Sequence, residues 1–219
     1  MNKPLTILLG LVVETDLPLI QGDCLGVDFG VDFADQHQLS LVGAIGDFDS
    51  VSLSRLSKLK ETYGQRWIHL PAQKDVTDAD YAIEWAIEQG YQPIYILGGI
   101  GGRTDHFYAL LNTLTRHAGY PLILLNAQQS ISALIPGSYV VEATHQYVSI
   151  FAKDEALISI KDAVYPLHKK KLSPHDSLGI SNTWVNEQPI QLMIERGIVL
   201  VFLSSDSSSQ NKTTSKTTL

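Results

Sequence analysis

The chain has 219 residues and a net charge of −7, from 16 Lys and Arg against 23 Asp and Glu. Its hydrophobic content of 44% allows a substantial core, and its acidity argues against a protein that binds nucleic acid through a basic face. A single cysteine, Cys24, excludes a disulfide framework and a cysteine-ligated zinc site. The longest early apolar run, residues 5–13, is about half the length of a membrane-spanning helix. We therefore expect a cytoplasmic protein with no membrane or nucleic-acid partner.

The first two-thirds of the chain alternate short apolar runs with helical patterns. Thr77 gives the clearest helix start, because it is a good N-cap and Asp80 stands three residues later, as in a capping box. Alternating strands and helices predict a mostly parallel sheet that is covered on both faces. The predicted strands are 5–13, 24–28, 41–45, 67–70, 93–97 and 122–125, and the predicted helices are 52–63, 77–89 and 103–118.

After about residue 126 the pattern changes to short apolar runs separated by Pro, Gly and other turn residues. Such a pattern is typical of an antiparallel β-sandwich. The predicted strands there are 131–135, 139–141, 147–151, 156–160, 190–194 and 198–203. We therefore predict an α/β N-terminal domain over residues 1–126, an all-β C-terminal sandwich over 127–204 and a disordered polar tail over 205–219.

The first candidate site is an acidic pair, Asp47 and Asp49, directly after the predicted strand 41–45. Ligands of a parallel sheet bind at the carboxyl ends of its strands. Mg²⁺ prefers oxygen ligands, so two carboxylates in this place are a candidate metal site. The alternative is that both residues only form a turn and cap the next helix.

A second acidic cluster, with Asp75 and Asp78 around Thr77, surrounds the start of the next predicted helix. Acidic residues in a first helical turn interact favourably with the helix dipole, so they need no ligand. However, this loop also follows a strand, and acids that meet at one sheet edge repel each other unless a cation intervenes. Convergence of Asp78 with Asp47 and Asp49 therefore favours a metal site.

A glycine-rich segment, GGIGGRTDH at residues 98–106, lies between a predicted strand and a predicted helix. This layout points backbone N–H groups and the positive end of a helix dipole at an anion, and Arg103 adds a fork suited to phosphate. The alternative is a tight turn that needs glycine only for its backbone conformation. The number of glycines, including Gly99, Gly101 and Gly102, favours phosphate binding.

Taken together, these motifs resemble those of the thiamine pyrophosphokinase family. GDFDS at 46–50, KDVTD at 74–78 and GGIGGRTDH with Asn112 occur in the family's order and spacing, and SLGISN at 177–182 resembles its bacterial members. The resemblance covers about residues 24 to 206. It implies transfer of the pyrophosphoryl group of ATP to thiamine, which gives thiamine diphosphate and AMP. It also implies an α/β domain, a β-sandwich, and a homodimer with active sites between the α/β domain of one subunit and the β domain of the other.

The resemblance also implies roles for individual residues. Asp47, Asp49 and Asp78 would hold Mg²⁺, with Asp75 and Thr77 in the same site. Arg103, Asp105, His106 and Asn112 would contact ATP or position the reacting groups, and Ser181 and Asn182 would meet thiamine. Either Asp75 or Asp105 would accept the proton of the thiamine hydroxyl.

The chain departs from the family pattern at two motifs, and its N-terminal residues 5–23 match the family poorly. The usual Asp-Gly/Arg-Gly-Ala is here Asp28-Phe29-Gly30-Val31, and Tyr165 stands where some members carry Trp.

Three other functions use part of the same residues. A metal-dependent phosphatase or a glycosyltransferase also uses Asp-x-Asp after a strand, and a non-catalytic thiamine or nucleotide sensor would retain the binding loops.

Overall fold

In a computed structural model we describe residues 3–48, 53–71 and 75–206. The chain divides into two compact units, which we describe separately. The first comprises Met1–Leu114 and Tyr120–Ala127, and the second comprises Thr115–Gly119 and Gln128–Leu219. Ser205 and Asp206 still form hydrogen bonds to residues 128 and 146, whereas 207–219, most of the predicted tail, lie outside the described residues.

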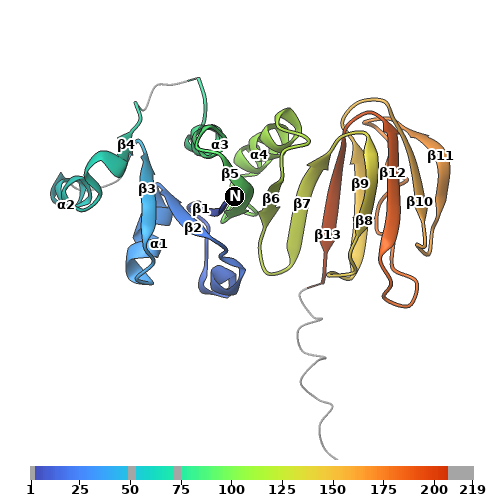
Figure 1. The fold of residues 1–219 in the computed structure, drawn as a ribbon, viewed down its shortest axis with the longest axis horizontal. Helices are drawn as coiled ribbons and strands as arrows, with labels where there is room; N and C mark the ends of the chain where they lie inside the picture. The colour runs from blue at the N-terminus through green and yellow to red at the C-terminus, as the bar shows by residue number, and fades with distance from the viewer. Residues whose placement is uncertain (1–2, 49–52, 72–74, 207–219) are drawn as a thin grey trace, which may run out of the picture. The chain divides into compact units, whose positions relative to one another are not determined.

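The first unit is built on a parallel sheet with the strand order β4-β3-β2-β1-β5-β6 (Figure 1). Its central strands are buried at consecutive positions, which requires cover on both faces. The strands are β1 (Lys3–Leu8), β2 (Asp23–Val27), β3 (Leu41–Gly46), β4 (Trp67–His69), β5 (Tyr91–Leu97) and β6 (Leu122–Leu125). The helices are α1 (Phe29–Gln36), α2 (Leu53–Tyr63), α3 (Asp78–Glu88) and α4 (Thr104–Arg116), with 3₁₀ turns η1 (Glu14–Leu19) and η2 (Gly64–Arg66).

The strand order reverses at β1. From β1 the chain proceeds outward through β2, β3 and β4, and then returns to place β5 on the other side of β1. In open parallel sheets this reversal leaves a crevice outside the carboxyl ends of the two central strands, and ligands bind there. The loops after β1 and β5 therefore border the expected binding position.

Near its start the structure differs from the sequence prediction in one strand boundary and in one helix that was not predicted. The first strand ends at Leu8 rather than at residue 13, because the chain turns after it: Val12 N donates to Leu9 O at 3.2 Å. The apolar run continues because this turn is itself packed into the core, where Leu9 and Val12 are buried. Helix α1 was not predicted, since Gly30 and two aspartates obscure its short helical pattern.

The second unit contains two antiparallel sheets, with strand orders β7-β13-β9 and β11-β10-β12-β8 (Figure 1). Val148, Ile158 and Leu192 belong to one buried cluster with side chains from both sheets, as in a sandwich. The prediction of an α/β region with a mostly parallel sheet followed by antiparallel β-structure is thus confirmed. The strands are β7 (Gln129–Leu134), β8 (Gly137–Val141), β9 (Tyr147–Ala152), β10 (Ala156–Lys161), β11 (Leu167–Leu172), β12 (Ile190–Arg196) and β13 (Val199–Ser204).

Strand β11 was not predicted, because its sequence LHKKKL has no strand-like alternation. It lies at the edge of its sheet, where exposed lysines disfavour pairing with another chain. The lysine run therefore has a structural explanation within the second unit.

An ion-pair cluster joins α2 to α1 in the first unit. Arg55 Nη2 lies 2.7 Å from Asp32 Oδ1 and 2.6 Å from Asp35 Oδ2, and Tyr63 Oη donates to Asp35 Oδ1 at 3.3 Å. Burial and the Asp35 carboxylate raise the pKa of Tyr63 to about 12.

The raised pKa of Tyr63 predicts a loss of stability in alkali. The folded state disfavours the phenolate, so the stabilisation is complete below pH 10, the value for an unfolded tyrosine, and is lost as the pH rises towards 12. We expect chemical unfolding between pH 9 and about 12 to show this loss in the wild type and a smaller loss in Tyr63→Phe. Equal slopes in both proteins would contradict the assignment.

Candidate active site

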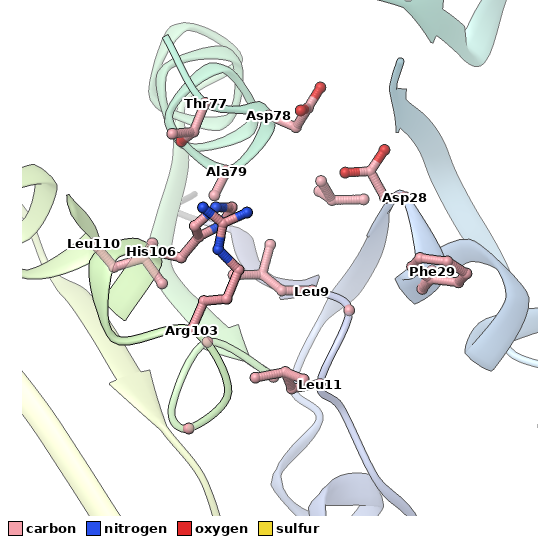
Figure 2. Close-up of a pocket in the computed structure, with 15 residues that line it drawn as sticks. Leu9, Leu11, Asp28, Phe29, Thr77, Asp78, Ala79, Arg103, His106 and Leu110 are labelled. Carbon is pink, nitrogen blue, oxygen red and sulfur yellow. The ribbon is translucent and has the colours of Figure 1, made fainter. Parts of the chain in front are cut away.

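A cavity of about 320 Å³ lies in the first unit at the carboxyl ends of β1, β2 and β5 (Figure 2). This is the position where the strand order reverses. Its lining comes from the loops after these strands and from the starts of α3 and α4. The lining residues are Leu9, Gly10, Leu11, Val27, Asp28, Phe29, Thr77, Asp78, Ala79, Gly98, Gly99, Gly101, Arg103, His106 and Leu110.

The start of α3 forms one wall of the cavity, and a buried carboxylate holds it in place. Asp80 N donates to Thr77 Oγ1 at 3.0 Å, and Thr77 Oγ1 donates to Asp80 Oδ2 at 3.0 Å, which confirms the predicted capping box. The other oxygen, Asp80 Oδ1, accepts a short hydrogen bond from Thr113 of α4. Asp80 and Thr113 are 8% and 1% exposed. This buried contact therefore links the helix that carries Asp78 to the helix that carries His106.

The glycine-rich turn forms a second wall. Gly98 has a φ of +76°, and a Cβ atom there would lie 2.3 Å from the Val12 backbone nitrogen, so only glycine fits. Leu11 N donates to Gly98 O at 3.2 Å, which binds this turn to the loop after β1. Gly101 and Gly102 also have positive φ angles. The turn brings Arg103 to the cavity.

Arg103 forms a two-point ion pair with Asp105. Its Nη2 lies 2.6 Å from Asp105 Oδ2 and its Nε lies 3.2 Å from Asp105 Oδ1. The Arg103 guanidinium lowers the pKa of Asp105 to about 2. Both side chains are exposed, so the pair contributes little to stability. It uses the Nε and Nη2 atoms of a guanidinium that has five N–H donors, and the other donors can bind an anionic ligand.

The end of β3 presents Asp47 beside a strained residue. Phe48 has a φ of +50°, which is unusual for a bulky side chain, and its ring stacks on Trp67 at 3.9 Å between centroids. His69 Nε2 donates to the Asp47 carbonyl oxygen at 3.0 Å. These contacts determine the backbone path at Asp47, and Asp49 lies outside the described residues.

The structure brings together part of the predicted site. Thr77, Asp78, Gly99, Gly101, Arg103 and His106 line the cavity, whereas Asp47, Asp75, Gly102, Asp105 and Asn112 are not among its lining residues. Sequence reasoning missed the residues after β1 and assigned no role to Asp28. Asp28 is the N-cap residue of α1, and Figure 2 shows its carboxylate and that of Asp78 at the same end of the cavity. The loop after β1 could have been assigned to the site only from the strand order of the sheet, and the sequence pattern does not give the strand order.

Within the described residues, no group of three His, Cys, Asp or Glu side chains is arranged to hold a metal ion. Nor do the described parts of the chain include a helix that is long and apolar enough to cross a membrane.

In the second unit, the segment that carries Ser181 and Asn182 lies along the free edge of β9. Ile150 N donates to Gly179 O at 2.9 Å, and Ser181 N donates to Ser149 Oγ at 2.9 Å. Asn182 is buried, and its side chain is used internally. Its Oδ1 accepts from Tyr165 N at 3.0 Å, and its Nδ2 donates to Tyr165 O at 2.8 Å. Ser181 remains exposed beside this clamp.

Two family models match the chain. The thiamin pyrophosphokinase catalytic domain matches residues 24–124, and the thiamin pyrophosphokinase vitamin B1 binding domain matches residues 138–199. The chain belongs to the thiamin pyrophosphokinase family. It is therefore an enzyme of the kinase class.

Individual proteins agree with this assignment. Thiamine pyrophosphokinase of Bacillus subtilis is 28% identical over 188 residues, which cover 83% of this chain and 87% of that protein. The crystal structure of the Bacillus subtilis enzyme has a TM-score of 0.81 and 26% identity, and covers 93% of this chain and all of the other. That of Geobacillus thermodenitrificans thiamin pyrophosphokinase also has a TM-score of 0.81, with 28% identity over 95% of this chain and 99% of the other.

The matched ranges divide the lining of the cavity into two parts. The catalytic-domain match begins at residue 24, so it includes Asp28, the start of α3 and the glycine-rich turn. Leu9, Gly10 and Leu11 line the same cavity but precede the match. This part of the wall belongs to the chain's own N-terminal segment.

Proposed function

We propose that the enzyme transfers the pyrophosphoryl group of ATP to thiamine, with thiamine diphosphate and AMP as products. The observation that carries the proposal is the cavity in the first unit, where Arg103, the glycine-rich turn and the amino end of α3 face one space. Each of these elements favours phosphate. A reaction that consumes ATP fits the cytoplasm, which we propose as the location.

We propose Asp47, Asp49 and Asp78 as Mg²⁺ ligands, with Asp28 beside them. The donor set fits this ion, since Mg²⁺ takes one or two carboxylates and completes its shell with water and substrate phosphates. The carboxylates of Asp28 and Asp78 at one end of the cavity supply such oxygens (Figure 2). When bound, the ion would neutralise phosphate charge.

The transfer needs an in-line nucleophile and neutralised phosphate charge rather than a covalent enzyme intermediate. The thiamine hydroxyl oxygen forms a bond to the β-phosphorus of ATP, and the bond from that phosphorus to the oxygen it shares with the α-phosphate breaks. AMP leaves. We propose that Arg103 binds the phosphates, with Gly99, Gly101, Gly102, His106 and Asn112 on the same side.

We propose Asp75 rather than Asp105 as the acceptor of the hydroxyl proton. The pKa of Asp105 is about 2, and a carboxylate of such low pKa is a weak base. Asp105 instead orients the Arg103 guanidinium through its two-point ion pair. Asp75 is exposed at the loop before α3, where a substrate can reach it.

We propose that thiamine meets the second unit at Ser181 and Asn182. The Asn182 side chain hydrogen-bonds both backbone groups of Tyr165, so its proposed role is to position the segment around Tyr165. As the family resemblance implies, we propose a homodimer whose sites combine the first unit of one subunit with the second unit of the other. Mixing inactive Arg103→Ala with inactive Ser181→Ala protein should then restore part of the activity. A mixture that stays inactive while mixed dimers form would contradict shared sites.

Gly179 supplies a separate test of the thiamine side. A Cβ atom at Gly179 would lie 2.4 Å from the Ile150 carbonyl oxygen, so Gly179→Ala must push the segment away from β9. We expect the KM for thiamine to rise about tenfold or more, while the affinity for ATP stays within about twofold. Steady-state kinetics with each substrate varied measure both. An unchanged KM for thiamine would remove this segment from the site.

The reaction itself is tested by AMP release from Mg-ATP with and without thiamine. The proposed function predicts AMP only when thiamine is present, with thiamine diphosphate in equal amount. A phosphatase of the strand Asp-x-Asp type would release inorganic phosphate, and a sensor would bind without turnover. Either of these results would overturn the proposal.

A further inference from the structure

The phosphate-binding cavity of the first unit has an apolar rim that the phosphate groups do not explain. Leu11 and Phe29 line it and are 47% and 59% exposed. Leu11 belongs to the loop after β1, and Phe29 is the first residue of α1. Large apolar side chains that stay exposed beside a cavity mark a surface for an apolar ligand group.

Gly10 connects these two side chains along the rim. Gly10 lies between them and has no side chain, and a Cβ atom there would be 3.7 Å from the Phe29 Cβ. Leu11 is held against the glycine-rich turn, since a Cβ atom at Gly102 would be 2.8 Å from Leu11 Cδ1. Leu11, Gly10 and Phe29 therefore form one continuous rim, which we call the apolar slot.

The same cavity also carries charged side chains. In Figure 2 the carboxylates of Asp28 and Asp78 lie toward the top and Leu11 toward the bottom, while Arg103 and Phe29 lie on opposite sides at mid-height. A nucleoside triphosphate likewise combines a flat aromatic base with a chain of charged phosphates, so Arg103 and the exposed Phe29 ring can contact different parts of one such ligand. Bases stack on aromatic side chains without the need for specific hydrogen bonds.

We propose that the apolar slot binds the purine base of ATP, with Phe29 as a stacking platform and Leu11 as the second contact. This proposal rests on the proposed function, because it assumes that the phosphates of the same nucleotide meet Arg103. Phe29 stands where the family pattern has Gly or Arg, so the platform is a feature of this chain.

Equilibrium binding tests the slot without any turnover. We would titrate ATP and inorganic tripolyphosphate, each with Mg²⁺, into the full-length wild type and into Phe29→Ala, Phe29→Tyr and Leu11→Ala. Tyr108→Ala is the matched control, because Tyr108 is 60% exposed on α4 and does not line the cavity. We expect Phe29→Ala to weaken ATP binding about tenfold, with tripolyphosphate unchanged. Leu11→Ala should weaken ATP binding less, whereas Phe29→Tyr and Tyr108→Ala should match the wild type.

Three results in Phe29→Ala would overturn the proposed base-binding role of the apolar slot. The first is an unchanged affinity for ATP, and the second is an equal loss of affinity for tripolyphosphate. The third is a raised KM for thiamine with an unchanged KM for ATP, which would assign the Phe29 ring to thiamine. The two proposals fail separately. If ATP binding depends on Phe29 but no thiamine-dependent AMP forms, the apolar slot is supported and the proposed function fails. If Phe29→Ala still forms thiamine-dependent AMP and binds ATP as tightly as the wild type, only the apolar slot is rejected.

Discussion

Replacing Asp78 with asparagine should reduce turnover by at least about 100-fold, because the cavity loses a proposed Mg²⁺ ligand while the side chain keeps its shape. Asp78 begins α3 and lines the cavity, so it lies where a metal-bound triphosphate would meet the protein. Activity measured over a range of Mg²⁺ concentrations would show whether excess metal restores part of the rate. Partial restoration is expected for a lost ligand.

The competing explanation for Asp78 is the helix dipole. An acid in the first turn contributes about 0.3–1 kcal/mol to helix stability even without any ligand. Under that explanation Asp78→Asn would lower stability by this amount and leave turnover unchanged. Glu88→Gln is the matched control, because it removes a carboxylate from the exposed end of the same helix. A rate in Asp78→Asn equal to that of Glu88→Gln would remove Asp78 from the metal site.

Breaking the buried contact between Asp80 and Thr113 should reduce stability and activity together. A buried hydrogen bond to a charged group contributes about 1.5–3 kcal/mol, so Asp80→Asn and Thr113→Val should each cost about 2 kcal/mol in the free energy of unfolding. Because the contact joins α3 to α4, the walls that carry Asp78 and His106 should lose their alignment. We expect kcat to fall more than KM rises, since misaligned reacting groups slow the transfer itself.

A double-mutant cycle separates this contact from general damage. If Asp80 and Thr113 act through each other, the double variant should lose at least about 1 kcal/mol less than the sum of the single losses. Thr62→Val is the control. The hydroxyls of Thr62 and Thr113 each lie within hydrogen-bond distance of the carbonyl oxygen four residues earlier in their helix, but Thr62 is exposed on α2. Additive losses, or an equal loss in Thr62→Val, would show that the contact is not what holds the two helices.

Local signals made part of this molecule predictable. The capping box of Thr77 and Asp80 needs only four consecutive residues, and the structure forms it as the sequence indicates. The glycine-rich turn is also local, since positive φ angles at Gly101 and Gly102 follow from what glycine allows. Strand periodicity placed both features at the carboxyl edge of the sheet. The alternation of strands and helices was sufficient to identify a parallel sheet.

Features that depend on strand order were not predictable in this way. Leu9, Gly10 and Leu11 join the cavity only because β5 pairs with β1. This pairing joins Leu5 to Ile94, which stands 89 residues later, and local periodicity does not report a contact over such a separation. The apolar run through Val12 resembled a longer strand, because a buried turn and a buried strand both appear in the sequence as a continuous run of apolar residues. Phe29 was visible only as a departure from the family pattern, because an exposed aromatic residue indicates a binding role only beside a cavity.

The central claim is that both transferred phosphates come from one ATP in one step. Reaction of thiamine with ATP that is isotopically labelled at the β-phosphorus or at the γ-phosphorus tests it most directly, with products followed by mass spectrometry. Our account predicts thiamine diphosphate that carries either label in full, together with AMP and without ADP. Thiamine diphosphate labelled only from the γ-phosphorus, with ADP and thiamine monophosphate, would mean two successive phosphoryl transfers and would contradict it.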